Sequence, residues 1–218
     1  MALWELIATE TAGPDSEAAM FIFGLAFAEA SGAEILCADF SNPSLAKMVD
    51  ITNQAWPSEY STQPKAEISD RVEKLYEFMP RHSGLRLFSP EAFGGEPEDL
   101  LNALAGNFKV VSFNIRNVFS VFTDERDTEN KIYLLENSIE TFNQLQELEF
   151  NPIFAHSVLV PTSKPLQPKK WQAEFPRMKL FDFRINSGTR RAVEFGYGVP
   201  RNSNVFRCAK NISKEVVW

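Results

Sequence analysis

The segment from Glu17 to Ser31 constrains the fold of this chain more than any other, because it is apolar on nearly every side when drawn as a helix. A helix of that kind is buried all round. Its continuous apolar stretch of about a dozen residues is too short to cross a bilayer. Short apolar runs flank it at 3–8 and 34–39, and Gly32 is a typical helix-ending residue. The first 43 residues therefore predict a strand–helix–strand unit, which implies a parallel sheet covered by helices.

Short apolar runs and longer helical patterns continue to alternate to the C-terminus. The patterns predict strands at 85–88, 108–113, 118–122 and 153–160, and helices at 67–79, 97–105, 189–195 and from Asp127 or Thr128 to Leu145. A chain of 218 residues is long enough for one domain with a large core. We expect residues 1–218 to form a single α/β domain of three layers, with a mostly parallel sheet flanked by helices.

The two cysteines, Cys37 and Cys208, and the two histidines, His82 and His156, have neither the pattern of a disulfide framework nor the spacing of a metal site. We therefore expect no metal ion and a reduced, cytoplasmic protein. Cys37 is expected in a buried strand and His82 in an exposed loop. For His156 we expect a hydrogen-bonded strand residue rather than a catalytic one. No basic segment opens the chain, so no signal peptide is expected.

The loop predicted at 9–16 is the place to look for a ligand, because α/β sheets bind ligands at the carboxyl ends of their strands. A phosphate-binding loop there needs glycines that wrap the phosphates, a lysine for the β- and γ-oxygens, and a hydroxyl for Mg²⁺. This loop keeps Gly13 but continues with Asp15, Ser16 and Glu17. A plain strand-to-helix turn is the alternative, since acidic residues suit a helix N-terminus.

In the order and spacing of its segments, the chain resembles the ParA/MinD family of partition and positioning ATPases. The segments that carry the resemblance are Leu6-Ile7-Ala8, Ala18-Ala19-Met20, Ile35-Leu36-Cys37-Ala38-Asp39, 84–90, 107–112 and 190–196. The resemblance implies a P-loop NTPase fold that opens with a deviant Walker A loop. Aligned by spacing, it places the family's two lysines at Thr11 and Ser16, its Mg²⁺-binding threonine at Glu17, its glycines at Ala12, Gly13 and Asp15, an aspartate at Asp39, and the Walker B aspartate at Ser112.

These substitutions remove the groups that bind a nucleotide. Asp15 and Glu17 place carboxylates where a triphosphate would lie, and each like-charge contact at about 4 Å costs about 4 kcal/mol before screening at an effective dielectric of ~20. We expect no ATP or Mg²⁺, no catalytic residue and no ATP hydrolysis. The resemblance then implies a degenerate bacterial ParA/MinD-like protein, a pseudo-ATPase that forms a homodimer or binds another protein. Its role would be protein interaction or regulation in plasmid or chromosome partition, conjugation or subcellular positioning.

The formal net charge of -7 conceals a split along the chain. Residues 1–163 hold 10 Lys and Arg against 25 Asp and Glu, whereas the basic segment 164–218 holds 12 against 4. C-terminal basic residues of ParA-like proteins contact DNA without sequence specificity. The resemblance therefore implies a DNA surface made of Lys169, Lys170, Arg190, Arg191, Arg201 and Arg207.

Three alternatives stay open at this point. The basic residues can instead pair with the acidic body, within the chain or across a dimer. The protein can be an ATPase that is completed by a partner protein supplying the missing lysine. It can also be an accessory DNA-binding protein that uses its basic C-terminus.

Overall fold

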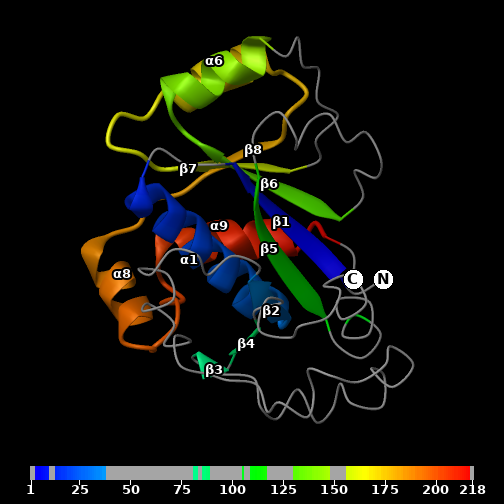
Figure 1. Cartoon of the computed structure of the whole chain (residues 1–218), viewed down its shortest axis with the longest axis vertical. Coiled ribbons are helices and arrows are strands. Elements are labelled where there is room, and N and C mark those ends of the chain that lie inside the picture. The colour runs from blue at the N-terminus through cyan, green and yellow to red at the C-terminus, as the bar shows by residue number, and fades with distance from the viewer. Residues whose placement is uncertain are drawn as a thin grey trace, which may run out of the picture.

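The computed structural model of the chain describes residues 3–9, 13–37, 81–82, 85–88, 105, 109–116, 130–147 and 156–216. The described strands are β1 (Leu3–Thr9), β2 (Glu34–Cys37), β3 (Arg81–His82), β4 (Leu85–Phe88), β5 (Val110–Arg116), β6 (Lys131–Glu136), β7 (Ser157–Val160) and β8 (Leu180–Asp182). The described helices are α1 (Pro14–Ser31), α6 (Ile139–Glu147), α7 (Pro168–Glu174), α8 (Ser187–Glu194) and α9 (Asn204–Ser213) (Figure 1).

The described strands form a sheet with the order β3-β4-β2-β5-β1-β6-β7-β8. The β3–β4 pair is antiparallel, and the other described pairs are parallel. β1 lies inside the sheet, where Leu6 is opposite Phe113 of β5 on one side and Ile132 of β6 on the other. The mostly parallel α/β sheet predicted from the sequence is confirmed, and the carboxyl ends of its parallel strands meet at one edge.

Helices cover both faces of this sheet (Figure 1). Successive residues of a strand point to opposite faces. Leu6 of β1 accordingly belongs to the core shared with α1, α8 and α9, whereas Ile7 belongs to the core shared with α6 and α7. Phe23 of α1 lies in the first core and Trp171 of α7 in the second, and both are fully buried. The molecule therefore has the three layers that the sequence predicted.

α1 is buried from Ala18 to Ala28, as its apolar sequence predicted. It packs against the sheet and against α9 (Figure 1). The helix begins at Pro14, three residues earlier than predicted, because proline has no N–H to leave unpaired and its fixed φ suits the first turn of a helix. It ends at Gly32, which adopts a left-handed φ of 65°, as expected for a helix-ending glycine.

The helix predicted up to Leu145 is wrong in its first half, where Lys131–Glu136 forms β6. β6 lies between β1 and β7, and its residues from Ile132 to Glu136 are all buried. A strand covered on both faces carries a continuous apolar run. Such a run also contains apolar residues at helical spacing, so that spacing does not indicate a helix here. α6 begins only after Ser138, whose hydroxyl accepts a hydrogen bond from the Thr141 N–H at 3.1 Å.

The other predicted elements differ mainly at their ends. β4, the strand of Cys37 and the helix that begins at Ser187 are present as predicted, whereas β5 continues to Arg116. His82 lies in β3, paired with Leu85, and not in a loop. The helix predicted at 67–79, the strand at 118–122 and all but Ala105 of the helix at 97–105 lie outside the described residues. Within the described ranges, none of the helices is long and apolar enough to cross a membrane.

Candidate functional site

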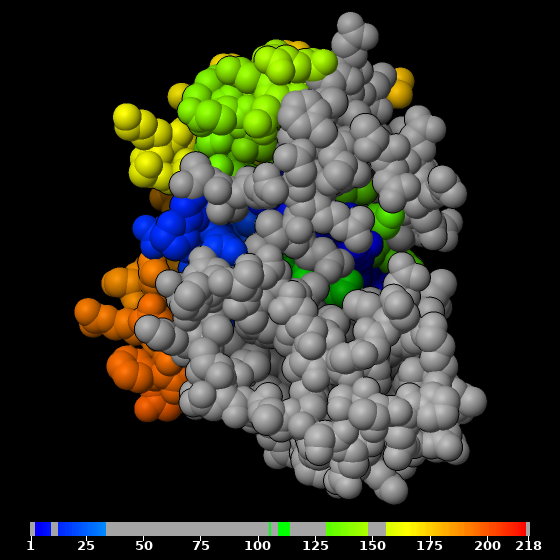
Figure 2. Space-filling view, in the orientation of Figure 1, coloured from blue at the N-terminus to red at the C-terminus, as the bar shows by residue number. Residues whose placement is uncertain are grey.

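A pocket of about 770 Å³ opens at the carboxyl edge of the sheet. Its lining comes from the segments that follow β1, β6, β7 and β8, together with the first turns of α1 and α8. The order in which strands are added to the sheet reverses at β1. β2 and β5 lie on one side of it, and β6 to β8 lie on the other. Ligands of open α/β sheets bind at such a point. The start of α1 reaches the surface here between α6 and α8 (Figure 2).

Among the described helices, three begin at this pocket: α1 at Pro14, α6 at Ile139 and α8 at Ser187. A helix N-terminus carries free N–H groups and a partial positive charge. In α8, one of these N–H groups has a partner within the chain. The Asn186 side chain accepts a hydrogen bond from the Thr189 N–H at 2.7 Å. α1 begins after a glycine, which has no capping side chain, and carries acidic residues in its first turn instead.

A buried polar contact of the pocket joins α1 to β6. Ser16 is buried, and its hydroxyl donates a hydrogen bond to Glu136 Oε1 at 2.7 Å. Glu136 is only 5% exposed and ends β6. Thr9 fixes the two strand ends together, since its hydroxyl donates to the Leu134 carbonyl and accepts from the Glu136 N–H, both at 3.4 Å. A buried carboxylate therefore lies beside the position to which the resemblance assigned a lysine.

Glu136 is a site residue that is not among those predicted from the sequence. It directly follows the apolar run from Ile132 to Leu135 and precedes a capping serine. An acidic residue between a buried strand and a helix cap is a signal for a strand end at the ligand edge. The helical spacing of Ile132, Leu135 and Ile139 hides that signal, because it predicts a helix across the strand end.

Asp15 forms the outer contact of the pocket. Its carboxylate oxygen Oδ1 lies 2.6 Å from Nη1 of Arg190, which comes from α8. Arg190 also donates from Nε to Glu194 Oε1 at 3.1 Å. The hydrogen bond with Asp15 is the main reason that the pKa of Arg190 is raised. For Arg190, the interpretation that basic C-terminal residues pair with the acidic body is therefore correct, although the resemblance assigned this residue to a DNA surface.

The described lining of the pocket contains the carboxylates of Asp15, Glu136 and Glu140 but only two cationic side chains, Lys164 and Arg190. Arg190 is already held by two carboxylates. A triphosphate in this pocket would lie near like charges in partly buried surroundings, where repulsion is strong. On electrostatic grounds, the described part of the lining is a poor fit for Mg-ATP.

The remaining residues of the predicted loop site are dispersed. Gly13 is the N-cap of α1, and Glu17 lies in its first turn. Ser112 is buried in the middle of β5, opposite Glu5 of β1 and four residues before the strand ends at Arg116. Ser112 therefore does not reach the pocket. Thr11, Ala12 and Asp39 lie outside the described residues.

The six cations proposed for DNA do not share one surface. Lys169 and Lys170 belong to α7, on the sheet face opposite to α8 and α9, and Lys170 Nζ lies 4.7 Å from the centroid of the Phe142 ring. Arg191 is exposed on α8. Arg201 and Arg207 lie before and within the start of α9.

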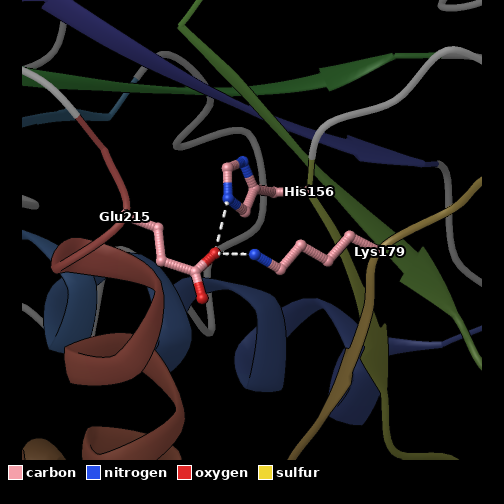
Figure 3. A network of polar contacts seen from close by, with 3 residues as sticks. All are labelled: His156, Lys179 and Glu215. Atoms are coloured by element: carbon pink, nitrogen blue, oxygen red, sulfur yellow. Dashed lines mark hydrogen bonds and ion pairs between the residues drawn. The ribbon is translucent and has the colours of Figure 1, made fainter.

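His156 lies at the opposite edge of the sheet, directly before β7 (Figure 3). Its Nε2 is 3.1 Å from Glu215 Oε2, and Lys179 donates to the same oxygen. The hydrogen bond from Lys179, followed by the one from His156, lowers the pKa of Glu215. The predicted hydrogen bond of His156 is therefore confirmed, although the residue lies just before β7 and not within a strand. No group of three or more side chains that could hold a metal ion is found in the part of the chain that the structure describes.

No family model matches the sequence, and no curated protein matches it. Several solved structures do match. A ParA family ATPase from Chlorobium tepidum is 16% identical, with a TM-score of 0.56 over 98% of this chain and 99% of that chain. The MinC:MinD cell division protein complex of Aquifex aeolicus gives 10% identity and a TM-score of 0.57 over 99% and 98%. The septum site-determining protein MinD with Mg-ADP from Pyrococcus horikoshii gives 11% and 0.54 over 98% and 95%.

Identities this low establish the fold and nothing finer. The likeness extends over nearly the whole length of each chain. It agrees with the parallel sheet and with the long buried helix that follows β1. The chain therefore has the three-layer α/β fold of the ParA/MinD ATPases.

Proposed function

We propose that this protein is a ParA/MinD-like protein that does not hydrolyse ATP. It serves instead as a protein-interaction or regulatory partner in plasmid or chromosome partition, conjugation or the positioning of a complex in the cell. The observation that carries this proposal is the buried Glu136 carboxylate 2.7 Å from the Ser16 hydroxyl at the start of α1. Phosphoryl transfer depends on positioning and on positive charge around the phosphates, whereas the described lining of this pocket holds the carboxylates of Asp15, Glu136 and Glu140.

Protein interaction is supported by the fold and by the exposure of the pocket rim. One of the similar solved structures is a complex of two proteins, MinC and MinD. In this chain, Asp15 at the start of α1 is 85% exposed, and the rim lies open between α6 and α8 (Figure 2). We infer that this rim, residues 13–17 with the start of α8, contacts the partner.

Isothermal titration calorimetry with ATP and Mg²⁺ tests the loss of nucleotide chemistry. We expect no saturable binding at millimolar ATP, and an active ParA-type ATPase in the same buffer serves as the positive control. Micromolar binding contradicts the proposal. Hydrolysis that appears only when a partner protein is added would instead support an ATPase completed by that partner.

Affinity purification from the native cells tests the partner role. The same partner is expected to co-purify in the presence and absence of Mg-ATP. Asp15→Arg reverses the exposed charge of the rim and is expected to release the partner. Glu174→Arg is the matched control, because Glu174 is exposed on α7, across the sheet from α1 and α8. Equal recovery of the partner with Asp15→Arg and the wild type contradicts the assignment of the rim.

Nucleic-acid binding is a second candidate function, favoured by the cations around the start of α9. Arg207 is exposed and makes no ion pair with the described residues. Arg201 is 84% exposed, and its one carboxylate neighbour among the described residues is Glu29, 3.9 Å away. Such cations are the groups that phosphates bind.

A further inference from the structure

Two large aromatic side chains stand exposed next to one another just after α8. Phe195 is 72% exposed and Tyr197 is 81% exposed. Their ring centroids are 6.5 Å apart, with the ring planes at 46°. Ile139, the other large apolar side chain exposed in the described part of the chain, is 41% exposed. A pair of rings left in water is the kind of feature that marks a binding surface.

The backbone holds these rings outward. Gly196 and Gly198 flank Tyr197 with φ values of 73° and 75°, a left-handed conformation that strains residues with a side chain. The Gly196 N–H donates to the Val193 carbonyl and the Tyr197 N–H to the Ala192 carbonyl, both at 2.9 Å. The turn is thus fixed to the end of α8, so presenting the rings costs little further ordering. α8 itself projects at the edge of the molecule (Figure 2).

The cations nearest to this turn in the sequence are arginines: residues 180–209 contain five Arg and no Lys. Arg191 lies one helical turn before Phe195 and therefore on the same side of α8. The Arg184 N–H donates to Asn204 Oδ1 at 2.7 Å, and Arg207 Nε lies 3.5 Å from the Ser203 carbonyl. Arg184 and Arg207 therefore both lie at the start of α9.

These arginines have few internal partners. Arg184, Arg191 and Arg207 make no ion pair with any described residue. Residues 195–214 contain no Asp or Glu. Glu194, the acidic residue nearest to the rings in sequence, is held by Arg190. The surface is consequently open to an anion from outside the chain.

We propose that the arginine–aromatic surface, formed by Arg184, Arg191, Phe195, Tyr197, Arg201 and Arg207, binds single-stranded nucleic acid. Unpaired bases stack on exposed rings, and guanidinium groups bind the phosphates and also stack on bases. A duplex keeps its bases stacked inside, so it would use the arginines and leave the rings in water. An anionic membrane would attract lysines as well as arginines, whereas residues 180–209 contain arginines and no lysine. The proposal specifies the second candidate function and is independent of the loss of ATP hydrolysis.

Fluorescence anisotropy with labelled oligo(dT) on the full chain tests this surface. We expect binding that weakens with salt, and weaker binding of a duplex of equal length. The double variant Phe195→Ala/Tyr197→Ala is expected to lose about tenfold to hundredfold in affinity with an unchanged salt slope, because stacking is lost while phosphate contacts stay. Arg191→Gln/Arg201→Gln is expected to reduce the salt slope by about 1.4, since each of the two lost phosphate contacts on a single strand contributes about 0.7.

Lys169→Gln/Lys170→Gln on α7 is the matched control and is expected to bind oligo(dT) like the wild type. All six positions are on exposed side chains, and circular dichroism checks that each variant is folded. Equal affinity for duplex and oligo(dT), or an unchanged affinity of the aromatic variant, overturns the proposal. Binding to phosphatidylglycerol vesicles without binding to oligo(dT) overturns it in favour of a membrane. Neither result bears on the ATP calorimetry, so the two proposals fail separately.

Discussion

Cys208 lies on the buried face of α9, and burial raises the pKa of its thiol to about 12, with a smaller contribution from the carboxylate of Asp182. The reactive species of a cysteine is the thiolate. In a Cys37→Ser background, we therefore expect no reaction of native protein with Ellman's reagent near pH 8, and one thiol per chain in guanidinium. Rapid labelling of the native protein would contradict the burial of Cys208 against α1.

Glu215 is expected to make the folded state less stable in acid than at neutral pH. Its hydrogen bond from Lys179, with that from His156, lowers the pKa of the folded state below the ordinary value of 4.5. The ionised carboxylate therefore stabilises the fold above that value, and the effect is lost as the pH falls through the folded-state pKa. Because both partners are partly exposed, Glu215→Gln is expected to cost less than about 1 kcal/mol at neutral pH.

Urea unfolding of wild type and Glu215→Gln, at neutral pH and near pH 3, measures this difference. The two midpoints are expected to differ at neutral pH and to converge in acid. Lys179→Gln is the control that removes the other partner, and it is expected to lower the midpoint at neutral pH in the same way. A difference that grows as the pH falls would contradict the assignment.

At the level of elements, Asn137 connects β6 to α7. Its side chain donates to the Leu166 carbonyl at 3.0 Å and accepts from the Leu166 N–H at 3.1 Å and from Trp171 Nε1 at 2.8 Å. Asn137→Ala leaves buried donors without partners, so we expect a loss of about 2–3 kcal/mol in the free energy of unfolding. Chemical denaturation measures it, and Trp171 fluorescence reports the disturbed loop.

The matched control is Asn211→Ala, because Asn211 is exposed on α9. A surface change of this kind is expected to stay within about 0.5 kcal/mol. If the two alanine variants unfold at the same denaturant concentration, the connection through Asn137 is not what holds the β7–α7 segment.

Elements whose pattern is complete within one continuous segment could be predicted from the sequence. α1 is such a case, since its burial and its end at Gly32 are both apparent from the contiguous segment Glu17 to Gly32. β6 could not be recognised, because its apolar residues fit a helix as well as a strand buried on both faces. The choice is made by β1 and β7, which lie on either side of it in the sheet. That pairing is tertiary information, which periodicity does not contain.

At the level of the whole molecule, the pocket is assembled from distant parts of the chain. Gly13, Asp15 and Ser16 could be identified because they follow the first strand directly. Glu136 and Arg190 contact them from 120 and 175 residues away. The sequence alone therefore locates the side of the pocket that follows β1. The charged residues on the other side, Glu136 and Arg190, are brought there by the tertiary fold.

Replacing the loop residues by those of an active phosphate loop tests what prevents ATP binding in this pocket. The cause is either the loop alone or the loop together with Glu136 of β6. The fourfold variant Thr11→Lys/Asp15→Gly/Ser16→Lys/Glu17→Thr supplies the residues that the resemblance assigns to an active loop. The ammonium introduced at position 16 would lie beside the buried Glu136 carboxylate, which neutralises it. ATP binding measured by calorimetry is therefore expected to stay weak in the fourfold variant. The affinity is expected to rise at least about tenfold when Glu136→Gln is added, since tenfold corresponds to only 1.4 kcal/mol.

Glu140→Gln, on an exposed carboxylate of the same pocket, is the matched control and is expected to change the affinity little. Tight ATP binding by the fourfold variant alone would show that the loop decides the chemistry by itself and that β6 has no part in it.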